Sequence, residues 1–179
     1  MTIESLQKIY AGRVIQLNIE RVRLPNGAVA DLEIVHHPGG AAVVALDAER
    51  RVCLLRQYRH AAGGWLWELP AGKIEHGEPP LTTAQRELQE EAGVSATQWR
   101  SLGDYYSSPG VLTEVVRLFL AFELSALPVR PEAHEVFEVH WLPFDAAYEM
   151  AGKGELCDGK SVVGVFRAAA LLRAAAPQG

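Results

Sequence analysis

The sequence has few of the residues that build disulfide frameworks or cysteine-based metal sites. Its only two cysteines, Cys53 and Cys157, lie far apart, and no CxxC pair is present. Such a pair provides neither a disulfide framework nor a zinc site. Cys53 lies in the apolar run VCLL, where a small buried thiol is the expected role. The six histidines show no ligand spacing with cysteine, so surface or packing roles are expected for them.

The sequence also lacks an apolar run that could span a membrane and an excess of positive charge. Its apolar C-terminal stretch, VVGVFRAAALLRAAA, is interrupted by Arg167 and Arg173, whereas a spanning helix needs about 20 apolar residues. The opening MTIESLQKIYAG lacks the basic region and apolar core of a signal peptide. The net charge of −5 provides no general attraction for DNA, RNA or an anionic membrane. We therefore expect a soluble, cytoplasmic protein with no nucleic-acid or membrane partner.

The composition, 49% hydrophobic and 22% charged over 179 residues, is that of one globular domain with a sizeable core. Residues 13–37, RVIQLNIERVRLPNGAVADLEIVHH, alternate apolar and polar side chains around PNG and predict a β-hairpin. Helices are predicted at Leu81–Ala92, from Asp145 to Met150, and at Val162–Ala175. Because strands outnumber helices and the helices come late, the fold class is α/β or α+β with a mixed sheet. The remaining strands are predicted in AAVVALD, RVCLLRQYR, WLWELPAG, VVRLFLAFEL and EVFEVHWLP.

The Leu81–Ala92 helix is predicted to have one apolar face. Pro79 and Pro80 suit its first turn, and Gly93 suits the left-handed position just after its end. Helical spacing predicts a buried stripe of Leu81, Ala84, Leu88 and Ala92.

Three glutamates of this helix converge on another face. Glu87, Glu90 and Glu91 stand at i, i+3 and i+4, where like charges destabilise a helix. Either this face is solvated or it binds a cation, and Mg²⁺ is the hard cation that such carboxylates favour. Arg86 can pair with Glu90 one turn on, or with Glu78 in the preceding loop.

A longer pattern around these glutamates decides between the two interpretations. A glycine, five residues, a glutamate, seven residues, then Arg-Glu-aliphatic-x-Glu-Glu-x-Gly-aliphatic resembles the signature of the Nudix hydrolases. All nine specified positions are met, by Gly72, Glu78, Arg86, Glu87, Leu88, Glu90, Glu91, Gly93 and Val94.

The resemblance implies a divalent metal site. It gives Glu87 and Glu91 as the principal ligands of Mg²⁺, or alternatively Mn²⁺, with Glu90 assisting. The backbone carbonyl of Ala71 is a further implied ligand. Arg86 and Glu78 would orient these ligands. Arg86 and Glu90 are also predicted to be catalytic residues.

Features outside the signature resemble the ADP-ribose pyrophosphatase branch of the family. Pro109 follows Gly93 by sixteen residues, the spacing seen in that branch, and LLRQYR followed by WELPAGKIE looks similar. Arg56 and Arg59 are predicted to share one strand face and to bind phosphate, with Arg59 the better match to the family's substrate-binding arginine. Glu68 is predicted to bind a ribose hydroxyl or a water. A simple turn at Pro109 and solvated arginines are the alternatives.

The general base is not fixed by the signature. In ADP-ribose hydrolases it is often a glutamate on a loop before a late strand. That loop is VRPEAHEVFEVHW here and offers Glu132, Glu135 and Glu138. We predict Glu135, then Glu132, with a solvated acidic loop as the alternative.

The resemblance covers nearly the whole chain and implies a Nudix α/β/α sandwich, residues 39–179, with an N-terminal antiparallel β extension, residues 1–38. That extension resembles the domain through which these enzymes dimerise, often by strand exchange, so a homodimer is expected. The expected reaction is Mg²⁺-dependent hydrolysis of a nucleoside diphosphate sugar, ADP-ribose giving AMP and ribose 5-phosphate. The alternatives are a GDP-sugar hydrolase acting on GDP-mannose, and a non-catalytic nucleotide-binding Nudix domain.

Overall fold

The computed structural model describes residues 2–128 and 136–175. The chain forms two compact units: unit 1 comprises residues 1–39 and 106–115, and unit 2 comprises residues 40–105 and 116–179. No helix in the described parts of the chain is long and apolar enough to cross a membrane.

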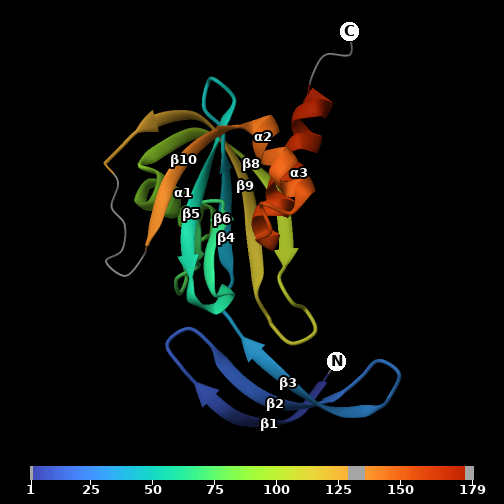
Figure 1. Ribbon diagram of the computed structural model, residues 1–179. Helices are drawn as coiled ribbons and strands as arrows, with labels where there is room; N and C mark the ends of the chain where they lie inside the picture. The colour runs from blue at the N-terminus through green and yellow to red at the C-terminus, as the bar shows by residue number, and fades with distance from the viewer. Residues whose placement is uncertain (1, 129–135, 176–179) are drawn as a thin grey trace. The chain divides into compact units, whose positions relative to one another are not determined.

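Unit 1 is built on an antiparallel sheet in the order β1-β2-β3, formed by Thr2–Ala11, Gln16–Arg23 and Val29–His36 (Figure 1). The hairpin predicted around PNG is confirmed as β2 and β3. Strand β1 was not predicted, because Ile3, Leu6 and Ile9 recur every third residue, which is not the period of a strand. Register shifts in the pairing of β1 with β2 allow that spacing within a strand.

Unit 2 contains two sheets. The four-stranded sheet has the order β7-β4-β9-β8 and is mixed, since β4 pairs parallel with β9 and antiparallel with β7. The three-stranded sheet has the order β10-β5-β6, with antiparallel pairing throughout. Strand β8 is an addition to the predicted elements. The strands are β4 (Gly40–Ala45), β5 (Arg51–Arg59), β6 (Gly64–Glu68), β7 (Ala71–Lys73), β8 (Val94–Tyr106), β9 (Val115–Ala126) and β10 (Phe137–Pro143).

The helices α1 (Pro80–Ala92), α2 (Phe144–Lys153) and α3 (Gly159–Ala175) complete unit 2. Helix α1 ends as predicted, because Gly93 has the left-handed φ of 64° that favours glycine. Helix α3 begins earlier than the predicted Val162. Asp158 immediately precedes it, and the Asp158 carboxylate accepts a hydrogen bond from the Ser161 amide (3.2 Å), as an N-cap residue does.

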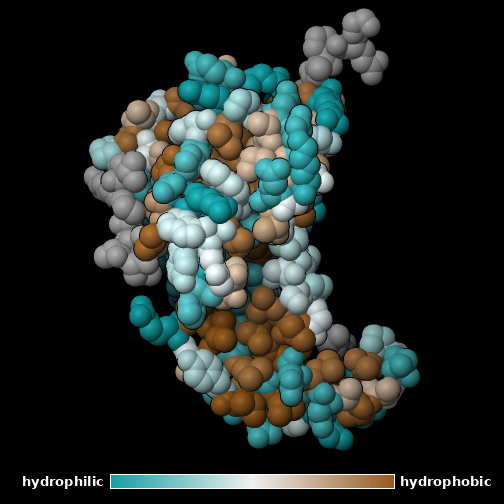
Figure 2. Space-filling model, viewed as in Figure 1, coloured by the Kyte–Doolittle hydropathy of each residue, from teal (hydrophilic) through white to brown (hydrophobic). Residues whose placement is uncertain are grey.

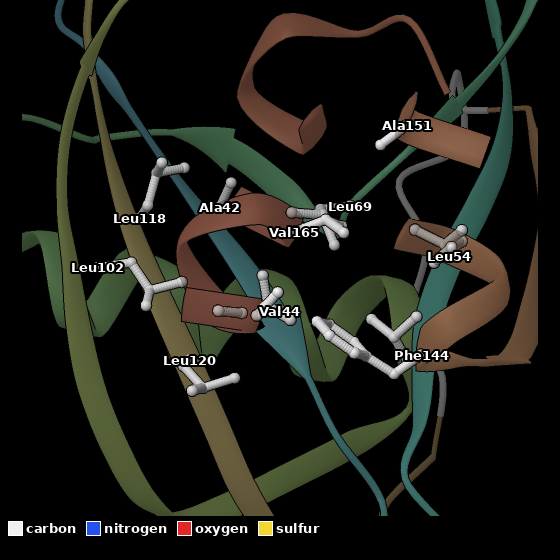
Figure 3. Packing of buried hydrophobic residues seen from close by; sticks show 14 of the residues in the cluster. Ala42, Val44, Leu54, Leu69, Leu102, Leu118, Leu120, Phe144, Ala151 and Val165 are labelled. Carbon is white, nitrogen blue, oxygen red and sulfur yellow. The ribbon is translucent and has the colours of Figure 1, made fainter. Parts of the chain in front are cut away.

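Strand β4 lies between two hydrophobic clusters. Ala41, Val43 and Ala45 belong to the cluster that includes Ala84 and Leu88 of α1. The alternate residues Ala42 and Val44 belong to the second cluster, which includes Val165 and Ala168 of α3, and Figure 3 shows its packing around Val44 and Val165. Because successive side chains of a strand point to opposite faces, the fully buried β4 separates the two clusters. The predicted α/β/α sandwich with a mixed sheet is confirmed.

Candidate active site

Helix α1 buries two of its three convergent glutamates. Glu87 is 8% exposed and Glu91 is 1% exposed. The helix packs against β4 and β7, so these carboxylates lie beside the sheet instead of on a solvated face. Leu81, predicted in the buried stripe, is 37% exposed, which makes that part of the prediction wrong. The buried surface of this helix therefore includes two carboxylates beside its apolar residues.

The backbone of β7 receives both buried carboxylates. The Ala71 amide donates a hydrogen bond to Glu91 Oε2 (2.8 Å). A Cβ atom on Gly72 would lie 1.8 Å from Glu87 Oε1, a distance that no pair of non-bonded atoms tolerates. The carboxylate of Glu87 thus occupies the space that any side chain at position 72 would fill, which gives this motif glycine a steric reason.

The guanidinium of Arg86 contacts three acidic residues, Glu78, Glu87 and Glu90. Its Nε and Nη2 atoms donate to the two carboxylate oxygens of Glu78, each at 3.2 Å. Its Nη1 atom donates to Glu87 Oε1 (2.6 Å) and to Glu90 Oε2 (3.0 Å). The structure therefore contains both of the pairings that the sequence left open. The hydrogen bond from Arg86 is the main reason that the pKa of Glu78 falls to about 2.

A second charged cluster lies at the end of β5. The Arg59 guanidinium binds Glu68 in a bidentate ion pair, with Nε to Oε1 and Nη2 to Oε2 both 2.8 Å. Glu68 is 2% exposed and also accepts a hydrogen bond from Lys160 Nζ (2.7 Å). Although burial by itself raises the pKa of Glu68, Arg59 and Lys160 lower it to about 2. Both oxygens of Glu68, which was predicted to bind a ribose hydroxyl or a water, thus accept hydrogen bonds from cations.

Residues 36–162 match the NUDIX domain. The chain belongs to the Nudix family. Two ADP-ribose pyrophosphatases, from Mycobacterium tuberculosis and Bacillus subtilis, are each 38% identical to it; they cover 90% and 89% of this chain and 80% and 87% of their own. A GDP-mannose pyrophosphatase from Escherichia coli is 33% identical and covers 73% of each chain.

A solved structure, described as an ADP compounds hydrolase, has the same fold as this Nudix chain. It superposes with a TM-score of 0.82 over 97% of this chain and 94% of its own, at 18% sequence identity. The predicted fold class and family membership are confirmed, and the chain is a Nudix hydrolase.

Nudix hydrolases generally use a divalent metal, and the donors on α1 fit one. Glu87, Glu90 and Glu91 together with the Ala71 carbonyl form an all-oxygen set, the kind that hard cations such as Mg²⁺ prefer. Among the described residues, no group of three aspartate, glutamate, histidine or cysteine side chains has the geometry of a metal site. The Nη1 atom of Arg86 bridges Glu87 and Glu90. Because Gly72 has no side chain, the carboxylate of Glu87 can lie beside the backbone of β7.

The prediction that Arg56 and Arg59 share a strand face is wrong. Arg56 pairs across the sheet with Trp67, and its guanidinium lies 5.3 Å from the centre of that ring. Leu55 pairs with Glu68, so Glu68 and its partner Arg59 lie on the other face. Side chains three residues apart on a strand point in opposite directions, because the strand period is two. Only Arg59 therefore belongs to the cluster around Glu68.

Pro109, another predicted site residue, belongs to neither of these two clusters. Pro109 belongs to unit 1, where it lines a pocket of about 320 Å³ together with Ile34, Tyr106 and Val111. Glu132 and Glu135, the predicted general bases, lie outside the described residues.

The sequence interpretation missed Lys160, Asp158 and Ser161. Their side chains contact Glu68, one another and the Leu69 amide. The available signal was Asp-Gly before an apolar helical run, which is typical of a helix N-terminus. The predicted helix begins at Val162, just after these three residues.

Proposed function

We propose that this Nudix hydrolase is an Mg²⁺-dependent ADP-ribose pyrophosphatase, with Mn²⁺ as the alternative ion. The observation that carries the proposal is the pair of buried glutamates, Glu87 and Glu91, beside the backbone of β7. Similarity to two ADP-ribose pyrophosphatases at 38% identity supports the substrate over GDP-mannose, whose hydrolase is 33% identical over less of the chain. A cytoplasmic location is part of the same proposal.

In the proposed reaction, water adds to one phosphorus of ADP-ribose while the bond from that phosphorus to the bridging oxygen breaks. The products are AMP and ribose 5-phosphate. Glu87, Glu90, Glu91 and the Ala71 carbonyl would hold the metal, which offsets the charge of the diphosphate and lowers the pKa of a bound water.

The protein's own residues position the reactants. Arg86 holds Glu87 and Glu90 through Nη1, so these carboxylates are oriented before substrate arrives. Arg59 would pair with a phosphate oxygen or a ribose hydroxyl. We propose Glu135 as the general base that accepts a proton from water, and Glu132 as the alternative. Arg56 and Pro109 remain predictions as substrate-binding residues.

The substrate proposal predicts a higher kcat/KM for ADP-ribose than for GDP-mannose or a nucleoside triphosphate. The metal and its ligands hold only the diphosphate, so selection depends on groups that contact the two ends. A triphosphate would place additional charge where the second ribose binds. The measurement is phosphate release from each compound with Mg²⁺, coupled to a phosphatase. If kcat/KM for GDP-mannose is higher by about tenfold, or 1.4 kcal/mol, the chain is instead a GDP-sugar hydrolase; if nothing is cleaved, it is a nucleotide-binding Nudix domain.

We also propose that residues 1–38 form a dimerisation domain and that the protein is a homodimer, with strand exchange as one route. Every residue of β1 is exposed, and Ile3, Leu6 and Ile9 are 53%, 53% and 48% exposed. Figure 2 shows apolar side chains gathered over this part of unit 1. Exposed apolar patches of this kind mark interaction surfaces.

Dimerisation predicts a light-scattering mass of twice the 19.6 kDa of the chain at micromolar concentration. Leu6→Asp is expected to lower this mass to that of a monomer, because the new carboxylate must be desolvated in the interface. Gln7→Asp adds the same charge to the neighbouring exposed residue of β1 and is the matched control. A stable, active wild-type monomer would contradict the assembly proposal.

A further inference from the structure

Three residues at the start of α3 bind the segment that connects the two charged clusters of unit 2. We name Asp158, Lys160 and Ser161 the α3 clamp. We infer that the α3 clamp positions the substrate-binding Arg59 through Glu68, and that Lys160 is its principal positioning residue. The inference rests on the proposed role of Arg59 in substrate binding and adds residues that the Nudix signature does not contain.

Lys160 is the connection between α3 and Glu68. Its Nζ atom donates to Glu68 Oε2 (2.7 Å) and to Asp158 Oδ2 (2.9 Å). The Lys160 side chain is 16% exposed, so most of the hydration of its charge is replaced by these two carboxylates. Burial by itself lowers the pKa of Lys160, but Asp158 and Glu68 raise it above its usual value. The ammonium group is therefore a permanent charge at neutral pH.

Ser161 binds the next residue of the same segment. It is completely buried, and its Oγ atom accepts a hydrogen bond from the Leu69 amide (2.8 Å). The same hydroxyl donates to Asp158 Oδ2, which orients it toward Leu69. One turn of α3 thus fixes two consecutive residues, Glu68 and Leu69, that lie 92 positions earlier in the sequence.

The segment after Leu69 leads directly to the proposed metal site. The Pro70 carbonyl accepts a hydrogen bond from the Val43 amide of β4 (2.9 Å). The Ala71 amide donates to Glu91 of α1. Four consecutive residues are therefore each held by a different contact, from α3, α3, β4 and α1 in turn. The α3 clamp supplies the two contacts at the end of the segment nearest to Arg59.

Glu68 transmits the position of Lys160 to Arg59. Its Oε2 atom accepts from both Lys160 and Arg59, and its Oε1 atom accepts from Arg59 alone. The bidentate pair fixes the plane of the guanidinium, because both hydrogen bonds must lie close to that plane. The Arg59 side chain is 41% exposed, and no other hydrogen-bond partner of Arg59 is found among the described residues. The pair with Glu68 uses Nε and Nη2, and the Nη1 donors of a guanidinium suit an anion.

Removing Lys160 should leave Glu68 free to change position together with Arg59. We expect Lys160→Met to raise KM for ADP-ribose by about tenfold, which is 1.4 kcal/mol, with a much smaller change in kcat. A rise in KM alone is the result for a group that holds the substrate equally in the ground state and the transition state. Lys160→Arg keeps the cation and should restore much of the loss. Lys153→Met makes the same substitution at an exposed lysine whose partner is Glu149, and should leave KM unchanged.

A double-mutant cycle with Arg59→Ala tests whether Lys160 acts through Arg59. If it does, Lys160→Met should have little further effect on KM in the Arg59→Ala background. Full additivity of the two effects would overturn the inference. If Lys160→Met does not fold, Asp158→Asn replaces it in the cycle, since this variant weakens one of the two acceptors of Lys160 and should give a smaller rise in KM with the same dependence on Arg59.

A measurement without substrate separates this inference from the proposed function. Hydrogen exchange of the Leu69 and Ala71 amides should become faster in Lys160→Met than in wild type or Lys153→Met, because the segment loses one of its two attachments to α3. Unchanged exchange at both amides would contradict the inference. A wild-type protein that does not cleave ADP-ribose would instead contradict the proposed function, and the exchange result would then decide the role of the α3 clamp.

Discussion

Glu91→Gln is expected to lower kcat by at least about 100-fold, or 2.7 kcal/mol in transition-state terms, while the fold remains intact. Glutamine keeps the size of the side chain and retains an oxygen that can accept the hydrogen bond of the Ala71 amide. It removes the negative charge that would hold a divalent ion in a site where Glu91 is 1% exposed. Steady-state kinetics with ADP-ribose, together with thermal unfolding of the same sample, measure the two effects separately.

The matched control for this variant is Glu149→Gln. Glu149 is also a helical glutamate, but it is exposed on α2, where it pairs with Lys153. Its replacement should leave kcat unchanged, because an exposed ion pair of this kind contributes little. Turnover close to that of wild type in a Glu87→Gln, Glu91→Gln double variant would contradict the assignment of the α1 carboxylates to the metal.

Gly72→Ala is expected to reduce kcat nearly as strongly, although it adds a single methyl group. The new Cβ would lie 1.8 Å from Oε1 and 2.1 Å from Cδ of Glu87. Because these atoms are the end of a flexible side chain, the carboxylate can move and the backbone need not. The φ angle of Gly72 is not positive, so alanine is compatible with this backbone. We therefore expect near-native stability with the Glu87 carboxylate displaced from β7.

Gly152→Ala is the control for the added methyl group. A Cβ at that position of α2 would meet no atom within 4 Å, so activity should not change. Measuring kcat and the melting temperature of both variants distinguishes a local displacement from unfolding. If Gly72→Ala retains wild-type kcat, the position of Glu87 against β7 is not important for the reaction.

The sequence predicted the features that depend on local spacing. The hairpin around PNG and the end of α1 at Gly93 follow from turn chemistry, which acts over a few residues. The convergence of Glu87 and Glu91 follows from the helical period. The signature also indicated the contacts of Arg86, because its partners Glu78 and Glu90 lie close by in the sequence.

The remaining features depend on contacts between distant parts of the chain. The burial of Glu87 and Glu91 depends on the packing of α1 against β7, which the helical pattern does not contain. Lys160 meets Glu68 only because the start of α3 lies beside the end of β6. Strand β1 has apolar residues spaced in threes, so its assignment requires the pairing with β2. Local patterns predict elements better than they predict which elements meet.

The most direct test of the proposed function is the identity of the products formed from ADP-ribose. Phosphorus NMR of a reaction with wild-type protein and Mg²⁺ should show the diphosphate resonances replaced by those of AMP and ribose 5-phosphate in equal amounts. Chelation of the metal should stop the conversion, and added Mg²⁺ should restore it. Persistence of the ADP-ribose resonances with Mg²⁺ present, or the same conversion after complete chelation, would contradict a metal-dependent ADP-ribose pyrophosphatase.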